Sequence, residues 1–231
     1  MQRFFDVIFS GVALLMLSPL LALVVVLLCF TGEGEVFFFQ ERVGKDGKPF
    51  KVFKFATMLK DSPSVGSGTV TTKNDPRVLP IGKFLRKTKV NELPQLLNIF
   101  CGDMSLVGPR PQTRRCFDAF PENLKQIIVQ VKPGLSGIGS IVFRGEEDII
   151  ADKANSLEFY DNVIAPYKGQ LEAWYVDHRT IAIYFTVIFV TVWVVIFFSS
   201  NLVWRVFKGL PVPPDELKKA LNYRKIKNEN F

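Results

Sequence analysis

The sequence predicts an α+β protein in which a mainly helical body carries a small β-hairpin and is joined to a membrane by apolar segments. Residues 4–30 and 180–200 are two long apolar runs. Two β-rich pieces, 36–43 and 49–55, flank a glycine-containing turn, as the strands of a hairpin do. Apolar residues between the two runs recur at helical spacing, in the part of the chain that holds most of the charge. We therefore expect four regions: 1–30, 31–179, 180–200 and 201–231.

The first apolar run is long enough to cross a bilayer, because a helix rises about 1.5 Å per residue and the hydrocarbon core is about 30 Å thick. The run is too long for the core of a signal peptide, and no small-residue cleavage site ends it, so we expect it to be retained. Pro19 removes one backbone N–H, and the Ser18 hydroxyl is placed to hydrogen-bond the freed carbonyl. A kinked spanning helix and a hairpin that returns to the same face both remain open.

The middle region is expected to alternate helices and loops. Apolar spacing predicts a helix from Asn91, a residue suited to capping it, and Pro94 is tolerated because it falls in the first turn. Gly102 is the expected C-cap. The composition further predicts a mobile loop at 61–74, a helix at 121–131, a loop at 132–139 and a helix at 151–176 that is interrupted near Pro166.

Charge and cysteine content narrow the function classes. The net charge of +7 suits anionic partners, which could be nucleic acid, phosphorylated substrates or anionic lipid headgroups. The three cysteines have no metal-site spacing and the chain has a single histidine, so neither a zinc enzyme nor a disulfide scaffold is expected. Free thiols agree with a reducing location for the polar part of the protein.

Cations are concentrated between Arg77 and Arg115, where acids are few. The cations are Arg77, Lys83, Arg86, Lys87, Lys89, Arg110, Arg114 and Arg115, and the acids are Glu92 and Asp103. Glu92 lies at a predicted helix start, and the nearby arginines should keep it ionised. Such a site suits a magnesium-bridged diphosphate and phosphoryl transfer. A solvated basic face is the alternative, although the rigid turn from Gly108 to Pro111 would aim Arg110 at a partner.

The motifs of this region resemble those of a known family. Asn91-Glu-Leu-Pro-Gln-Leu-Leu-Asn98, followed by Gly102-Asp-Met-Ser-Leu-Val-Gly-Pro-Arg-Pro111, resembles the signature of the bacterial sugar transferases, the small monotopic phosphoglycosyl transferases. Other pieces are similar in order and spacing: Phe38 to Gly44, Phe53-Lys54-Phe55 followed by Met58, Lys132 to Gly137, and Leu17-Ser18-Pro19-Leu20. The resemblance extends from the N-terminus to about residue 178.

The resemblance implies a specific reaction and location. Such enzymes take a UDP-sugar, release UMP and load sugar-1-phosphate onto undecaprenyl phosphate with the help of Mg²⁺. Their mechanism is ping-pong, through a phosphosugar bound to an aspartate that precedes the glutamate. Their N-terminal helix is re-entrant and kinked at Ser-Pro, which favours the hairpin here. The expected location is the bacterial inner (cytoplasmic) membrane, with the catalytic domain facing the cytoplasm.

The resemblance also implies roles for individual residues. The expected roles are catalysis and magnesium binding for Glu92 and Asn91, phosphate binding for Arg110, Arg86, Lys54 and, on a looser match, Arg144, a structural turn for Asp103, and the helix break for Ser18 and Pro19.

Two positions depart from the family's pattern. Asn91 occupies the place of the nucleophile, and an amide has no anionic oxygen to attack phosphorus. Glu92 could serve as nucleophile or base, the position could be a natural variant in an active subgroup, or the chain could be an inactive or engineered form. Ala56 replaces the family's usual arginine, which removes one cation near the site.

The second apolar run raises a question of topology. Residues 180–200 are apolar enough to span a membrane, yet the tail after them is basic, and the positive-inside rule would keep it cytoplasmic. One spanning helix cannot leave the body and the tail on the same side. Either the run lies in the interface or re-enters, or the tail is an exception to the rule.

The expected function is the start of a glycan repeat, for O-antigen, capsule or exopolysaccharide, on undecaprenyl phosphate. The main rival is a catalytically impaired relative that acts as a membrane assembly or regulatory protein. Nucleic acid is not an expected partner, because only Phe84 is available for base stacking among the cations from Arg77 to Lys89. Homo-oligomerisation is left open.

Overall fold

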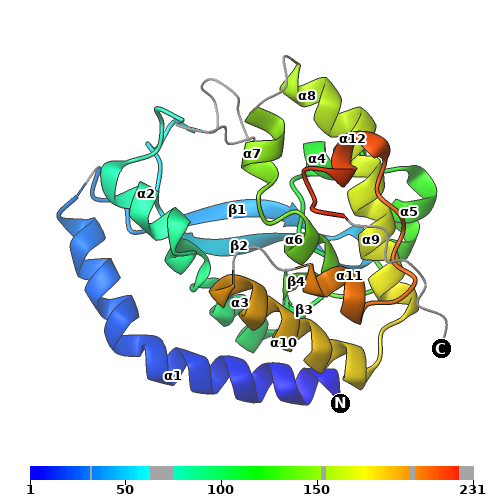
Figure 1. The fold of residues 1–231 in the computed structure, drawn as a ribbon. Helices are drawn as coiled ribbons and strands as arrows, with labels where there is room; N and C mark the ends of the chain where they lie inside the picture. Colours follow the sequence, from blue (N-terminus) through cyan, green and yellow to red (C-terminus); the bar gives the residue numbers. More distant parts are fainter. Residues whose placement is uncertain (32, 63–74, 152–154, 198–200, 224–231) are drawn as a thin grey trace.

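The computed structural model describes the chain except for residues 32, 63–74, 152–154, 198–200 and 224–231, so most of the predicted loop at 61–74 lies outside the described residues. The helices are α1 (Gln2–Cys29), α2 (Pro80–Lys87), α3 (Gln95–Cys101), α4 (Arg114–Asp118), α5 (Glu122–Ile128), α6 (Ile138–Val142), α7 (Glu146–Ala151), α8 (Ser156–Phe159), α9 (Ala165–Asp177), α10 (Ile181–Ile196), α11 (Leu202–Val206) and α12 (Asp215–Lys218). The strands are β1 (Phe37–Val43), β2 (Pro49–Phe55), β3 (Ser105–Val107) and β4 (Gly134–Ser136). Figure 1 shows helices surrounding two small strand pairs, as the α+β prediction requires.

Helix α1 is bent. One arm runs beneath α3 and α10, and the other turns up toward α2 (Figure 1). Proline is the usual cause of a sharp helix bend, and Pro19 lies inside this helix. The Ser18 Oγ donates a hydrogen bond to the Leu15 carbonyl at 2.8 Å, which is the carbonyl that a residue other than proline at 19 would have bonded. The predicted local compensation for Pro19 is therefore confirmed.

Both arms of α1 contact the body. Near the N-terminus, the Asp6 carboxylate is 2% exposed and accepts hydrogen bonds from Ser105 Oγ, the Leu106 N–H and the Tyr184 hydroxyl. Near the other end, Val24 and Leu28 belong to a small apolar cluster that also contains Phe55 of β2 and Leu85 of α2. The two ends of a 28-residue apolar helix are thus held by one folded unit.

The predicted hairpin is confirmed. β1 and β2 pair antiparallel from Phe37 opposite Phe55 to Val43 opposite Pro49. The connection contains a short 3₁₀ turn, η1 (Lys45–Gly47), in which Asp46 and Gly47 both have positive φ. The α3 helix is fixed to this hairpin by Asn98, whose side-chain amide bonds the Phe53 N–H at 2.9 Å and the Lys51 carbonyl at 2.8 Å.

The start of the central helix differs from the prediction. Asn91 does not cap α3, because it lies inside a 3₁₀ turn, η3 (Val90–Glu92), that follows Lys89 in a left-handed conformation (φ 60°). The α3 helix begins at Gln95, directly after Pro94. The reason is that Pro94 lacks a backbone N–H and separates the turn from the helix. Gly102 ends α3 with φ 103°, as predicted.

The loop predicted at 132–139 contains regular structure. Its residues Gly134–Ser136 form β4, which pairs in parallel with β3, and α6 begins at Ile138. The two backbone segments approach so closely that a Cβ at Gly134 would lie 2.1 Å from the Gly108 nitrogen. Glycine is therefore required at this crossing, where the chain leaves β3 and enters the turn at Gly108.

The two predicted helices of the later body are present with different lengths. The helix expected at 121–131 is the shorter α5. Of the helix expected at 151–176, Ala151 ends α7 and residues 152–154 lie outside the described residues; the remainder contains α8, a π-helical turn η4 (Tyr160–Ile164) and α9, with Pro166 in the first turn of α9. The predicted interruption near Pro166 is therefore confirmed, and its physical form is a widened turn just before the proline.

The main core also includes the chain after residue 200. Helix α10 buries Tyr184, Val187, Val190 and Val194 against the body. In the predicted basic tail, Trp204, Phe207, Leu217 and Leu221 are buried in the same core as α9. With 16 residues, α10 is shorter than the roughly 20 that a spanning helix needs, whereas α1 is long and apolar enough to cross a membrane.

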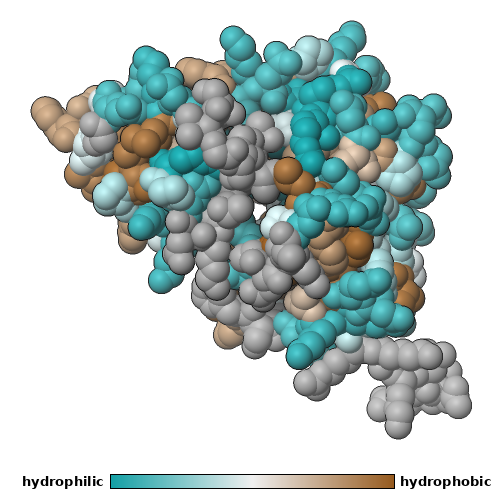
Figure 2. Space-filling model, turned by 90° about the horizontal axis from the view of Figure 1, so that it is seen from above, coloured by the Kyte–Doolittle hydropathy of each residue, from teal (hydrophilic) through white to brown (hydrophobic). Residues whose placement is uncertain are grey.

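The surface of the protein has one side rich in exposed apolar side chains and one side that is more hydrophilic. Large exposed hydrophobic side chains are concentrated on α1, α3 and α10, and include Phe4, Phe9, Leu15, Met16, Leu23, Leu97, Phe100, Phe189, Trp193 and Ile196. These three helices lie together on the lower side in Figure 1. Figure 2 shows the opposite face, whose coloured surface is largely hydrophilic, with hydrophobic patches at its left end, near its centre and on its right side. An exposed apolar area of this kind is typical of a surface that contacts a membrane or another protein.

Candidate active site

The hairpin contributes the first part of the site. Gln40 and Arg42 lie two residues apart on β1 and therefore point to the same face. The Gln40 Oε1 accepts hydrogen bonds from Arg42 Nη2 at 2.5 Å and from Lys54 Nζ on β2 at 3.3 Å. A second guanidinium nitrogen of Arg42 donates to the Pro111 carbonyl at 3.1 Å. Gln40 thus holds two cations together, and Arg42 ties the hairpin to the turn that carries Arg110.

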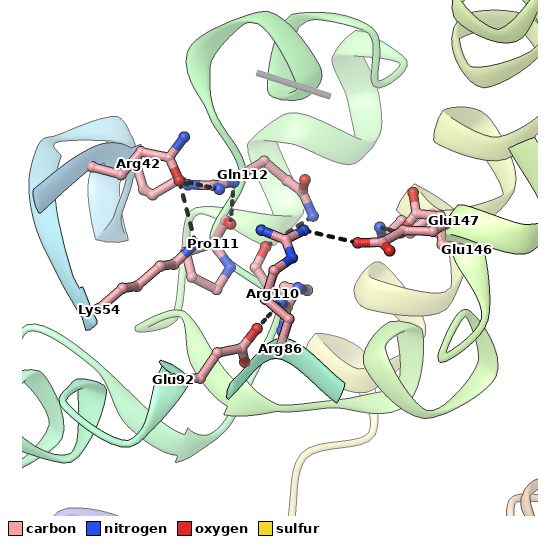
Figure 3. Close-up of polar contacts among 11 residues, drawn as sticks. Arg42, Lys54, Arg86, Glu92, Arg110, Pro111, Gln112, Glu146 and Glu147 are labelled. Carbon is pink, nitrogen blue, oxygen red and sulfur yellow. Dashed lines mark hydrogen bonds and ion pairs between the residues drawn. The ribbon is translucent and has the colours of Figure 1, made fainter. Parts of the chain in front are cut away.

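The centre of the site is an ion pair between the predicted residues Glu92 and Arg110. The Arg110 Nη2 lies 2.9 Å from Glu92 Oε1, and the Glu92 side chain is only 15% exposed. Glu92 comes from η3, and Arg110 comes from the turn after β3 (Figure 3). The flanking Pro109 and Pro111 restrict the backbone on both sides of Arg110, which agrees with the predicted rigid turn.

Electrostatics keep the carboxylate ionised. Burial raises the pKa of Glu92, but the positive charges of Arg110 and Lys54 outweigh it, and the pKa falls to about 2. Burial and repulsion from Arg42 lower the pKa of Lys54 to about 7. The charge of Glu92 raises the pKa of Arg110 further, so its guanidinium stays protonated. The site therefore presents an anion surrounded by cations, one of which titrates near neutral pH.

Arg86 lies at the edge of this group. Its charge is among those that lower the pKa of Lys54, so it belongs to the same cation cluster. Its Nη2 forms an ion pair at 3.0 Å with Glu147 Oε1, at the start of α7 (Figure 3). The neighbouring Glu146 is paired instead with the buried Lys168 Nζ at 2.6 Å. The acids at the start of α7 thus form one wall of the site.

Asn91 is 7% exposed, and its side-chain oxygen has no hydrogen-bond partner among the described residues. A buried polar atom without a partner is rare and requires an explanation, such as an absent ion. In the described parts of the chain, no three His, Cys, Asp or Glu side chains gather into a closed metal site. Mg²⁺ often takes only one or two protein oxygens together with substrate phosphates and waters. The ionised Glu92 and the free Asn91 oxygen fit such an open site.

The structure thus brings Lys54, Arg86, Glu92 and Arg110 together, with Asn91 adjacent in the chain to Glu92. The remaining predicted residues lie elsewhere or have another setting. Asp103 Oδ2 accepts a hydrogen bond at 3.3 Å from Asn98, next to the hairpin. Ser18 and Pro19 lie in α1. Arg144 is half-buried just after α6, and burial lowers its pKa.

Sequence reasoning did not assign several residues that the structure places at the site. Gln40 and Arg42 lie within the motif from Phe38 to Gly44. Because side chains alternate along a strand, their spacing could have predicted that both point to the same face of the hairpin. Glu147 and Glu172 have no such signal, because the sequence does not indicate that α7 and α9 approach the turn around Arg110.

Comparison with known proteins identifies a family and relatives for this chain. Residues 1–198 match the family described as bacterial sugar transferase. A UDP-glucose:undecaprenyl-phosphate glucose-1-phosphate transferase from Escherichia coli (strain K12) is 39% identical over 167 residues, which cover 69% of this chain and 35% of the relative. The protein of the same name from Klebsiella pneumoniae is 37% identical over 163 residues, covering 68% and 34%.

A shorter relative matches over most of its length. The exopolysaccharide production protein ExoY from Rhizobium meliloti (strain 1021) is 35% identical over 175 residues, which cover 70% of this chain and 77% of the relative. The chain spans about a third of the length of the first two relatives. The family match over residues 1–198, which includes every residue of the site, shows that this chain belongs to the bacterial sugar transferase family.

Proposed function

We propose that the chain transfers a sugar-1-phosphate from a UDP-sugar to undecaprenyl phosphate and so starts an O-antigen, capsule or exopolysaccharide repeat. The observation that carries this proposal is the ionised Glu92 held among Arg110, Lys54 and neighbouring cations. Such a cluster suits phosphoryl transfer, in which catalysis consists mainly of positioning and charge neutralisation. The names of the E. coli and K. pneumoniae relatives support the same reaction.

In this proposal the cations bind the diphosphate of the donor. Arg110 and Lys54 both lie near the Glu92 carboxylate. A phosphoryl group bound beside Glu92 would therefore take the place of this carboxylate as an ion-pair partner of the two cations. Bound Mg²⁺ would supply further neutralisation of the diphosphate charge, held by Glu92 and the Asn91 oxygen. Arg86 would leave Glu147 and contact the anion, because that pair is the more exposed of the two.

Glu92 is the residue that we assign as nucleophile. Its carboxylate would attack the β-phosphorus of the UDP-sugar, the bond to the α-phosphate oxygen would break, and UMP would leave. The phosphate oxygen of undecaprenyl phosphate would then attack the same phosphorus and release Glu92. Its pKa of about 2 keeps the carboxylate deprotonated at neutral pH, as this step requires.

In this proposal the protein is monotopic, so that it enters the membrane from one side and does not cross it. Both ends of α1 contact one body through Asp6 and through Leu28, so a re-entrant hairpin keeps both ends on one side, whereas a span would separate them. The exposed apolar face of α10 would lie in the same interface as α1, because Phe5 of α1 packs edge-on against Phe185 of α10. The hydrophilic face in Figure 2 would then face the cytoplasm, where UDP-sugars are found.

A second candidate function is favoured by Asn91. If the family's chemistry requires an acid at this position, the chain would bind donor and lipid without turning them over, as a membrane assembly or regulatory protein.

One assay separates the two functions. Membranes containing the native chain, Asn91→Asp or Glu92→Gln are given Mg²⁺, undecaprenyl phosphate and a panel of radiolabelled UDP-sugars that begins with UDP-glucose, and UMP is measured. The proposal predicts UMP release by the native chain and none by Glu92→Gln. Release by Asn91→Asp alone would establish the impaired relative instead. Acid quench and digestion should then locate the labelled phosphosugar on the peptide that contains Glu92.

A further inference from the structure

Glu172 is a buried carboxylate in the middle of α9. It is 1% exposed, although its helix is otherwise buried mainly through apolar side chains. The nearest cation along the helix, Lys168, forms its ion pair with Glu146 and not with Glu172. Burying a carboxylate without an ion-pair partner is costly unless hydrogen bonds compensate. The position of Glu172 therefore indicates a specific task.

The contacts of Glu172 connect it to the site. Its Oε1 accepts a hydrogen bond from the backbone N–H of Arg110 at 3.1 Å. The backbone N–H of Gly139, at the start of α6, faces this carboxylate and favours its charged form, while Glu172 Oε2 has no hydrogen-bond partner among the described residues. Burial raises the pKa of Glu172 to about 7, although the N–H groups of Arg110 and Gly139 and the charge of Lys168 act to lower it. One side chain thus joins the turn of Arg110 to α6.

The sequence leaves space for this carboxylate. A Cβ at position 139 would lie 2.4 Å from Glu172 Oε1, which is closer than real Cβ atoms approach, and a Cβ at position 137 would lie 3.6 Å from Oε2. Gly139 has no positive φ, so the need for glycine here is steric and not conformational. The approach of Glu172 to Arg110 therefore depends on glycine at 139.

We propose that Glu172 is a positioning residue that fixes the backbone of Arg110 and thereby sets the reach of its guanidinium toward Glu92 and the donor diphosphate. The assignment rests on the proposed function. Arg110 lies between two prolines that restrict its neighbours, and its own N–H is the donor that remains to fix this turn. With that N–H held by Glu172, the guanidinium reaches Glu92 at 2.9 Å.

The test uses two substitutions that break the same contact by different routes. Glu172→Leu removes the acceptor, and Gly139→Ala keeps the carboxylate but displaces it by the added Cβ. Glu172→Gln retains an acceptor oxygen and serves as the conservative variant. Two controls match the changes: Gly145→Ala, where an added Cβ meets nothing within 4 Å, and Gln170→Leu, on an exposed position of the same helix.

The readouts are the KM for the UDP-sugar in the UMP-release assay and the Kd of UDP with Mg²⁺ for the full-length chain in detergent. We expect Glu172→Leu and Gly139→Ala to raise both constants about tenfold, as the loss of one aligned charged contact does. Glu172→Gln should stay within about threefold of the native chain, and the two controls should be unchanged. The double variant Gly139→Ala/Glu172→Leu should be no worse than Glu172→Leu, because both changes remove one contact.

A merely structural role would lower the fraction of active protein, so kcat would fall while KM and Kd stayed constant. That result, or native constants in Gly139→Ala, would overturn the inference even though the native chain is active. If Glu172→Leu does not fold, Gly139→Ala and Glu172→Gln still decide the question. A native chain that neither releases UMP nor binds UDP would overturn the proposed function itself, and the inference with it.

Discussion

The substitution Glu92→Gln tests the centre of the site, because it removes the charge of the carboxylate and preserves its shape. The pKa of Glu92 is about 2 against an ordinary 4.5, which corresponds to about 3 kcal/mol in favour of the charged form. The side chain is 15% exposed, so solvent screening reduces this value only moderately. We expect Glu92→Gln to lower the thermal midpoint by about 6–12 °C, from the usual 2–4 °C per kcal/mol for a chain of this size.

The loss should depend on pH with a defined sign. The pKa of Glu92 is lowered by folding, so its stabilisation is fully present above about pH 4.5 and is lost as the pH falls toward 2. The difference in thermal midpoint between the native chain and Glu92→Gln should therefore be constant near neutral pH and should shrink below about pH 4.5.

The same substitution should reduce UMP release by at least about a thousandfold, as the removal of a nucleophile does. The matched control is Glu147→Gln, which breaks the ion pair with Arg86. The Glu147 side chain is 56% exposed, and such surface pairs contribute little stability. Native activity in Glu92→Gln would refute the assignment of Glu92 as nucleophile. An equal loss of stability in both variants would refute the electrostatic argument.

Three further predictions concern Lys54, Pro19 and Asp6. Burial lowers the pKa of Lys54 to about 7, so its positive charge is lost as the pH rises through 7; UDP binding, measured by titration, should weaken between about pH 6 and 8, and Lys54→Arg should flatten the profile. Replacing both Ser18 and Pro19 by alanine should straighten α1 and place its two ends on opposite sides of the membrane. A cysteine introduced at residue 2 and labelled from each side in turn would detect this change, and labelling from the cytoplasmic side alone would contradict the prediction. Asp6→Asn should cost about 2 kcal/mol, because three hydrogen-bond donors lose their charged acceptor, and a thermal midpoint within 1 °C of the native value would contradict that estimate.

Local features of the fold could be predicted because neighbouring residues determine them. The hairpin follows from β-rich pieces joined by a turn, and the end of α3 follows from the left-handed conformation that Gly102 readily adopts. Ser18 and Pro19 predict the bend of α1, because the sequence shows both that Pro19 lacks an N–H and that Ser18 supplies a nearby hydroxyl. The basic cluster around Glu92 could likewise be predicted from its composition alone.

Other features depend on contacts between distant segments. The β3–β4 pair has only three residues on each strand, too few to produce a readable alternation, and its partners lie 29 positions apart. The role of Glu172 is hidden because α9 is buried on most of its surface and has no polar face against which an acid would stand out. The start of α3 was placed wrongly because Asn91 has the residue type of a cap but the backbone of a 3₁₀ turn.

The contacts of Asp6 and Gln2 have a consequence for biosynthesis. Asp6 bonds Tyr184 across 178 positions, and Gln2 Nε2 bonds the carbonyl of Val107, the residue just before the turn of Arg110. The ribosome therefore completes the apolar helix long before its docking partners exist. Closing such long loops is slow, so we expect the helix to enter the lipid first and the strand leading to Arg110 to be secured only after most of the chain has been made. Maturation of the site would then come late and at the membrane.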